Sequence, residues 1–144
     1  MSKWNTETMH EYLKKAGFEG ETYTCPIYGI VKNNSFWATQ YNNQNCCYIA
    51  LSDYKRLLFV EFTMLTGTPL RMGALGFDDI VSAKVKKNIF GQYKFTFVFN
   101  INGKKQKFII HAAKKVYGTD LYEQEQNLME LVQFFEKIGH NLEY

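Results

Sequence analysis

The 144-residue sequence has little cysteine and no long apolar run. Its three cysteines, Cys25, Cys46 and Cys47, are an odd number, match no zinc-binding spacing and have no histidine pair beside them. No stretch approaches the roughly 18 apolar residues of a membrane span, and the N-terminal stretch MSKWNTETMHEYLKK lacks the apolar run of a signal peptide. We therefore expect a cytoplasmic protein with reduced thiols and no cofactor.

The sequence also gives no sign of a nucleophile, a base and an orienting group that the fold would bring together. His10, His111 and His140 fall in three different predicted elements, so no cysteine–histidine pair with a third, orienting group is indicated. Cys46 and Cys47 are neighbours on a predicted strand, so one of them should face outward as the more reactive thiol. We expect a protein that is not an enzyme and that has no catalytic or metal site.

A strongly patterned stretch runs from Phe77 to His111. Aromatic and polar residues alternate along residues 93–101, which predicts a strand with one apolar face. Asn102-Gly103 then predicts a type I′ hairpin turn, and a three-residue loop ending at a left-handed Gly91 joins the preceding strand. The two turns fix the register: Phe97 opposite Phe108 and Ala83, Phe95 opposite Ile110 and Val85, and Lys86 opposite Lys94. Val81, Ala83 and Val85 are expected on the inner face. The aromatic row is interpreted as core rather than as a base-stacking platform.

Charge is distributed unevenly along the chain. Residues 84–115 hold nine lysines and no acid, whereas the rest holds eight basic and fourteen acidic residues. The predicted register places five lysines on one outer face, and we take them as candidate anion- or partner-binding residues: Lys84, Lys86, Lys94, Lys105 and Lys107. The first interpretation is that they keep the outer strands soluble, and the second is a basic surface for an anionic partner. Because like charges facing across a ladder are unfavourable, Lys86 opposite Lys94 marks a place where function can lie.

The rest of the chain predicts a short helix, several strands and a long final helix. Residues 6–16 have helical spacing and end at Gly17. Strands are predicted at 23–32, 36–41, 46–51 and 56–64, the first of them at an edge because it contains Pro26. The glycine-rich segment 66–76 is predicted to be a long connection with room for a short strand, since no phosphate-binding GxxxxGK[ST] pattern is present.

The final helix is the most regular element. Thr119 is its predicted N-cap and Gly139 its predicted end, with acidic residues in the first turn. Its apolar stripe consists of Leu121, Leu128, Leu131, Val132, Phe135 and Ile138. We expect this stripe to close one open end of a strongly bent sheet. No internal repeat is present.

This element order resembles that of the pleckstrin-homology (PH) domain, and more specifically the bacterial PH-like domains. The similarity covers roughly residues 20–138 and lies in the segments CYIALSDYKRLLFVEF and LGFDDIVSAKVKK, the two hairpins and the final helix. It implies a mainly β fold: an antiparallel barrel of about seven strands capped by a C-terminal helix. It also implies that Asp78 and Asp79 are turn residues and that Leu57 and Phe59 belong to the core. We divide the chain into an N-terminal helical extension (1–19) and a PH-like domain (20–144).

The resemblance implies a scaffold rather than an enzyme. Eukaryotic PH domains often bind phosphoinositides through basic residues between their first two strands, but the corresponding VKNNSFW supplies only Lys32. Bacterial members mostly lack an assigned ligand, and several assemble into oligomers. We therefore expect a non-enzymatic binding or assembly module whose partner is a protein or a second copy of the chain. The alternative is a peripheral binder of anionic membranes or nucleic acid through the lysines.

Overall fold

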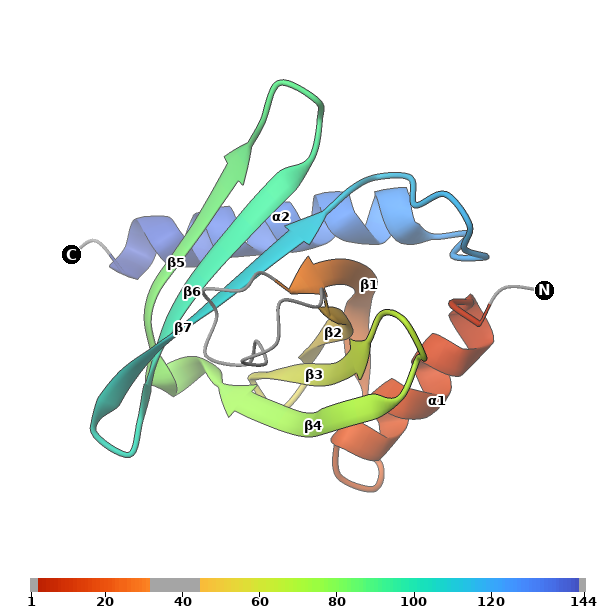
Figure 1. Cartoon of the computed structure of the whole chain (residues 1–144). Coiled ribbons are helices and arrows are strands. Elements are labelled where there is room, and N and C mark those ends of the chain that lie inside the picture. Colours follow the sequence, from red (N-terminus) through yellow and green to blue (C-terminus); the bar gives the residue numbers. More distant parts are fainter. Residues whose placement is uncertain (1–2, 32–44, 143–144) are drawn as a thin grey trace.

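The computed structural model describes residues 3–31 and 45–142, and its strands form one antiparallel sheet of seven. The elements in chain order are α1 (Thr6–Ala16), β1 (Tyr23–Val31), β2 (Asn45–Ser52), β3 (Arg56–Thr63), β4 (Pro69–Gly76), a single 3-10 turn η1 (Phe77–Asp79), β5 (Ile80–Lys87), β6 (Tyr93–Ile101), β7 (Lys104–Ala112) and α2 (Gln124–Leu142). The strand order is β4-β3-β2-β1-β7-β6-β5, so β4 and β5 are the two edges (Figure 1). The predicted mainly β class, with a short first helix and a long last one, is confirmed.

The predicted register of the two hairpins is confirmed. Phe97 pairs with Ala83 on one side and Phe108 on the other, and Lys86 pairs with Lys94. Asn102 and Gly103 both have positive φ, as a type I′ turn requires. Val81 was predicted on the inner face, and that prediction is wrong. The pairing shifts between Ile80 and Ser82, so Ile80 points inward and Val81 is exposed.

Two predictions about the first half of the sheet are also wrong. The strand containing Pro26 is central rather than at an edge, because Pro26 lies where the pairing of β1 with β2 shifts between Thr24 and Ile27. A bulge tolerates a residue without an N–H group as well as an edge does. Residues 69–76 form a full edge strand that pairs with β3. The predicted strand 36–41 and Lys32 lie outside the described residues.

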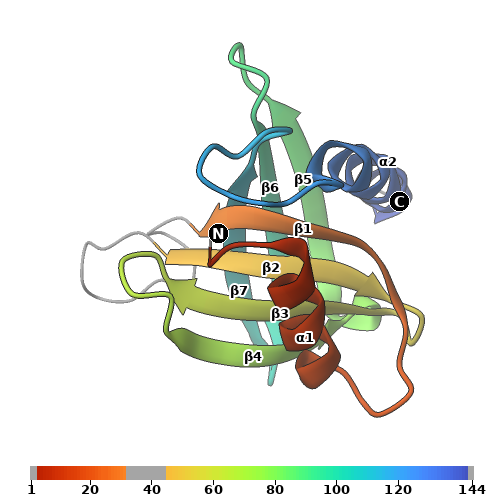
Figure 2. The ribbon, with the colours of Figure 1, turned by 90° about the vertical axis from the view of Figure 1, so that its right-hand side faces the viewer.

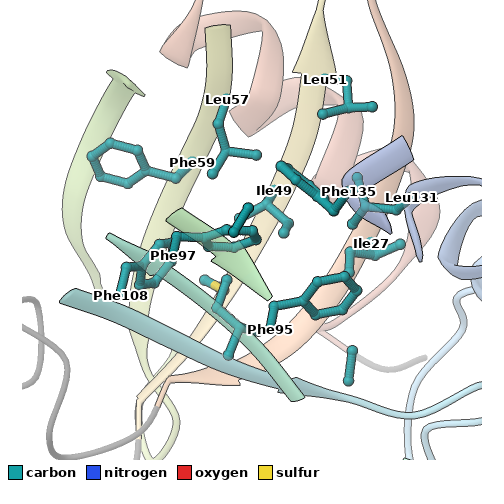
Figure 3. Packing of buried hydrophobic residues seen from close by; sticks show 14 of the residues in the cluster. Ile27, Ile49, Leu51, Leu57, Phe59, Phe95, Phe97, Phe108, Leu131 and Phe135 are labelled. Atoms are coloured by element: carbon teal, nitrogen blue, oxygen red, sulfur yellow. The ribbon is translucent and has the colours of Figure 1, made fainter. Parts of the chain in front are cut away.

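The core lies between the two halves of the folded sheet and beneath α2. Phe95, Phe97 and Phe99 are fully buried, which confirms the aromatic row as core. Figure 3 shows Phe97 among side chains from both halves and from the helix. Its ring centroid is 4.6 Å from that of Phe135 and 5.9 Å from that of Phe108. The core residues that the resemblance implied, Leu57 and Phe59, are buried as well.

Helix α2 is attached to the sheet through the backbone of β1. The Gln124 amide accepts a hydrogen bond from Tyr28 N and donates one to Tyr28 O, as a neighbouring strand would. Asn127 donates a further bond to the carbonyl of Pro26. The predicted cap is wrong: α2 begins at Gln124, and the Thr119 hydroxyl donates instead to Val116 O. The predicted end is also wrong, because the helix continues to Leu142.

Helix α1 covers the outer face of the β1–β4 half, as Figure 2 shows. Asn5 caps it by accepting a hydrogen bond from Thr8 N, and Met9 and Leu13 are buried against the sheet. Trp4 packs against Tyr48 and Phe62 of that face. The first helix is therefore part of the packed structure. On the outer face of β5–β7, lysine side chains are exposed, whereas Ile109 is buried.

A buried carboxylate fixes the segment between α1 and β1. Glu21 accepts hydrogen bonds from Arg56 and Ser52 and from the backbone N–H of Phe18, the last at 2.7 Å, and it forms an ion pair with Arg56. The Arg56 guanidinium also lies 4.0 Å from the centre of the Phe18 ring. Burial alone would raise the pKa of Glu21, but the hydrogen bonds and the Arg56 charge outweigh it and lower the pKa below its ordinary 4.5.

Replacing Glu21 with glutamine should lower the free energy of unfolding by about 1–3 kcal/mol, because Arg56 loses its partner. A carboxyl whose pKa is lower in the folded chain stabilises it above the ordinary pKa, and this contribution is lost as pH falls through the folded pKa. Denaturant melts from neutral pH to below 4.5 should therefore show a steeper acid loss in the wild type than in E21Q. Parallel pH curves would contradict the assignment.

Candidate anion-binding face

The outer face of β5–β7 carries the five candidate lysines. Lys84, Lys86, Lys94, Lys105 and Lys107 are all exposed. We call these five residues the lysine face. The ion pairs Glu21–Arg56 and Glu61–Arg71 both lie in the other half of the sheet. Because the five side chains are exposed, the charge of the lysine face is accessible from the solvent.

The structure brings only part of the lysine face together. Lys86 and Lys94 are paired residues, and Lys94 is in turn paired with His111. With Lys87 they surround a surface hollow of about 240 Å³, which we call the basic hollow. Its lining is completed by Asn88, Gln92 and Tyr93.

The other candidate lysines lie farther away. Lys84 is paired with Thr96, one row along the ladder from Lys86. Lys107 precedes His111 by four residues on β7, which is roughly 13 Å along a strand. Lys105 lies beyond it, beside the β6–β7 turn. The lysine face therefore has a dense end at the β5–β6 hairpin and a sparse end at the β6–β7 hairpin.

A larger hollow of about 500 Å³, lined by both polar and apolar residues, adjoins the basic one. The two share Gln92 and His111, and the larger also includes Trp4 and Lys115. It follows the seam where β1 meets β7, with the segment after β7 on one side. The sequence did not single out Lys87, His111 or Lys115 as site residues. The predicted register nevertheless implied that His111 lies opposite Lys94, and this was the available signal.

All three cysteines are buried, and Cys46 lies too far from His111 to form a nucleophilic pair with it. Burial raises the pKa of Cys25 to about 11 and that of Cys46 to about 12. Burial also raises the pKa of Cys47, which lies inside the core. Cys46 points outward, as one of the two neighbours must, but it is covered completely. Ile30 pairs with both Cys46 and His111, so those two lie two strand spacings apart, roughly 10 Å.

Glu61 is a buried carboxylate that the sequence analysis overlooked. Glu61 shares the inward side of β3 with Leu57 and Phe59, which precede it by four and two residues. This period-2 spacing was the signal from which its burial could have been predicted. Asn45 donates a hydrogen bond to it at 3.3 Å, and Arg71 lies 4.0 Å away. Burial raises its pKa, although the Asn45 bond and the Arg71 charge act in the opposite direction. Glu61 lies on the core side of β3 and does not line the basic hollow.

The remaining sequence predictions concern turns, metals and membranes. Asp78 and Asp79 lie in η1 immediately before β5, so the prediction that they are turn residues is confirmed. Within residues 3–31 and 45–142, no three histidine, cysteine or acidic side chains lie close enough together to hold a metal ion. No helix in the same part of the chain combines the length and hydropathy needed to span a bilayer.

Comparison with known proteins places the fold. No protein-family model and no curated protein matches the sequence. Among solved structures, the chain is similar to the hSac2 domain from human phosphoinositide phosphatase Sac2, with a TM-score of 0.57 and 12% sequence identity. The match covers 92% of this chain and 80% of that chain, and that domain has a PH-like fold. The PH-like fold is thus confirmed, whereas membership of a bacterial family stays a prediction.

Proposed function

We propose that this protein is a non-enzymatic binding module that holds an anionic partner on the dense end of the lysine face. The observation that carries the proposal is the pairing of Lys86 with Lys94, beside Lys87 and His111 around one hollow. Adjacent like charges weaken a sheet, and a bound anion removes that cost. A surface that needed charge only for solubility would gain more from lysines spread apart.

The lining of the basic hollow favours binding over catalysis. Its described lining residues offer ammonium groups, an imidazole and two amides, and none of them is acidic or a cysteine. The Tyr93 hydroxyl is directed into the core, where it donates to Met129. Such donors can hold a phosphate or carboxylate group by charge and hydrogen bonds. The buried titratable groups of the chain, such as Glu61 and Cys47, belong to the core and not to this surface.

Replacing Lys86 with glutamate and Lys94 with glutamine should reduce retention on a heparin column, so that the double variant elutes at clearly lower salt than the wild type. The thermal melt should move slightly upward, because a cross-strand repulsion of a few tenths of a kcal/mol is removed. The two measurements together separate loss of the surface from loss of the fold.

The matched control replaces Lys14 with glutamate and Lys15 with glutamine in α1. This control has the same net charge as the variant with Lys86 and Lys94 replaced. The two lysines that it loses lie in the last turn of α1 and do not line the hollow. Equal elution of both variants would mean that retention follows net charge alone. That result, or wild-type protein that passes through the column unretained, would refute the proposed function.

Assembly is the second candidate function, and one observation favours it. Strand β4 is an edge of the sheet and carries two partly exposed apolar side chains, Leu70 and Met72. An edge strand with apolar side chains is a template for pairing with another chain. Light scattering on the purified protein tests this, since a monomer at all concentrations would exclude self-association.

A further inference from the structure

We infer that the anionic partner is a lipid bilayer and that the turn between β5 and β6 inserts into it. This inference rests on the proposed function and adds to it the class of partner and a second contact. The element concerned is the dipeptide Ile89-Phe90 at the end of the hairpin, which we call the hairpin tip. Figure 1 shows this hairpin projecting beyond the rest of the molecule.

The hairpin tip is apolar and almost completely exposed. Ile89 is 93% and Phe90 is 83% accessible to solvent. Leu65 is 84% exposed as well, but neither of its neighbours in the chain is an exposed apolar residue. Two large apolar neighbours at the end of a projecting hairpin form a compact wedge. Transfer of this wedge from water into an apolar medium would be favourable in proportion to the apolar area removed from water.

The turn that presents the tip is held by its own hydrogen bonds. The side chain of Asn88 accepts bonds from the backbone N–H groups of Phe90 and Gln92, each at 2.9 Å. Asn88 N also donates to Gln92 O at 2.9 Å, and Gly91 adopts the left-handed conformation that closes the loop. The tip is therefore ordered before any contact, which reduces the entropy that binding must overcome.

Cations surround the base of the tip. Lys86 and Lys87 precede it on β5 and Lys94 follows it on β6. Three to four residues separate Phe90 from Lys87, Lys86 or Lys94, which corresponds to roughly 10–13 Å along a strand. Apolar groups of interfacial proteins are buried about 5–10 Å into the boundary between headgroups and acyl chains. A tip at that depth places the ammonium groups, with their flexible side chains, at the level of the lipid phosphates.

The segment after β7 supplies a second contact beside the hairpin. Lys115 and Tyr117 line the larger hollow together with Gln92 of the hairpin. Tyr117 is 92% exposed, and tyrosine is a residue that membrane interfaces favour because its ring is apolar and its hydroxyl is polar. Lys115 adds a further cation near the same surface, so the contact has two points rather than one.

The same geometry disfavours nucleic acid as the partner. Single-strand binders stack successive bases on aromatic rings beside lysines. Here Phe95, Phe97 and Phe99 are buried on the opposite side of β6 from Lys94. Of the two tip residues only Phe90 has an aromatic ring, so the tip does not offer a row of rings on which successive bases could stack. An apolar wedge above a ring of cations is complementary to an anionic bilayer.

The test compares vesicle binding with heparin binding in the same variants of the full chain. The probes are phosphatidylcholine vesicles with and without phosphatidylserine, in a co-sedimentation assay. Ile89→Ser with Phe90→Ser should weaken binding to the phosphatidylserine vesicles at least about tenfold and leave heparin elution unchanged. Leu65→Ser, an equally exposed apolar residue away from the hairpin, should change neither. Lys86→Glu with Lys94→Gln should weaken both.

A second variant reports insertion directly. Phe90→Trp should lose fluorescence in vesicles whose acyl chains are brominated, whereas Leu65→Trp should not. Wild-type protein that binds heparin but not vesicles would refute the membrane inference and leave the proposed function standing. Binding to neither probe would refute both. A tip variant that sediments like the wild type, or one that also loses heparin, would show that the tip does not act by insertion.

Discussion

Phe97→Ala should lower the free energy of unfolding by about 3–5 kcal/mol. The side chain is fully buried and packs against rings from its own strand, from β7 and from α2. Truncation removes the buried ring and leaves a cavity that neighbours from three elements cannot all move to fill. Urea or guanidinium denaturation with an unchanged m-value would measure the loss.

The matched control for this substitution is Phe90→Ala. It removes the same atoms from a ring that is 83% exposed, so the change in stability should stay within about 0.5 kcal/mol. A cost below about 1 kcal/mol for Phe97→Ala would mean that the aromatic row of β6 is accessible. The base-stacking interpretation of that row would then gain support.

The half of the fold that the sequence predicted well is governed by local signals. Asn102-Gly103 and Gly91 determine two turns, and strict alternation in β6 determines which face is buried. Every predicted pair that we named is present, because a shift of one residue would expose the whole aromatic row. Val81 is the exception, since the shift beside Ile80 depends on how β5 leaves the turn η1.

The poorly predicted half depends on contacts between distant segments. Pro26 is compatible with either an edge or a bulge, and only the positions of β2 and β7 decide between them. The start of α2 is determined by Gln124, which must reach the backbone of Tyr28 nearly a hundred residues earlier. A glycine-rich edge strand such as β4 has weak strand propensity of its own and forms because β3 offers a partner.

The candidate site divides in the same way. The sequence predicted that Lys86 and Lys94 face each other on the outer surface, because this follows from the turn geometry. The same register implied that His111 lies opposite Lys94, but it did not predict that Trp4 and Lys115 adjoin the same surface. Those neighbours depend on the seam between β1 and β7 and on the path of the chain after β7. Exposure of the hairpin tip likewise depends on nothing else packing against it.

The two faces of the sheet have different coverings, and this difference links the fold to the proposed function. Helix α1 closes the outer face of the β1–β4 half, and α2 closes the core between the halves. Each helix replaces solvent with apolar contacts on a surface that would otherwise be exposed. The five lysines on the outer face of β5–β7 are exposed instead, so their charge can be offered to a partner.

Removing residues 119–144 should therefore leave a chain that aggregates and shows no cooperative thermal transition. The deletion uncovers the core that Leu128, Leu131 and Phe135 close, all of them fully buried, and it leaves Tyr28 without its amide partners. An exposed apolar surface of this kind is an aggregation site, and loss of the backbone partners adds to the cost. Size-exclusion chromatography and a melt followed by circular dichroism would measure both effects.

Within the full chain, Leu131→Ala should lower the free energy of unfolding by about 2–5 kcal/mol, whereas Glu125→Ala on the exposed side of α2 should lower it by less than about 0.5 kcal/mol. A soluble truncated chain with a cooperative melt would mean that the sheet closes its own core, and α2 would then be available to bind a partner.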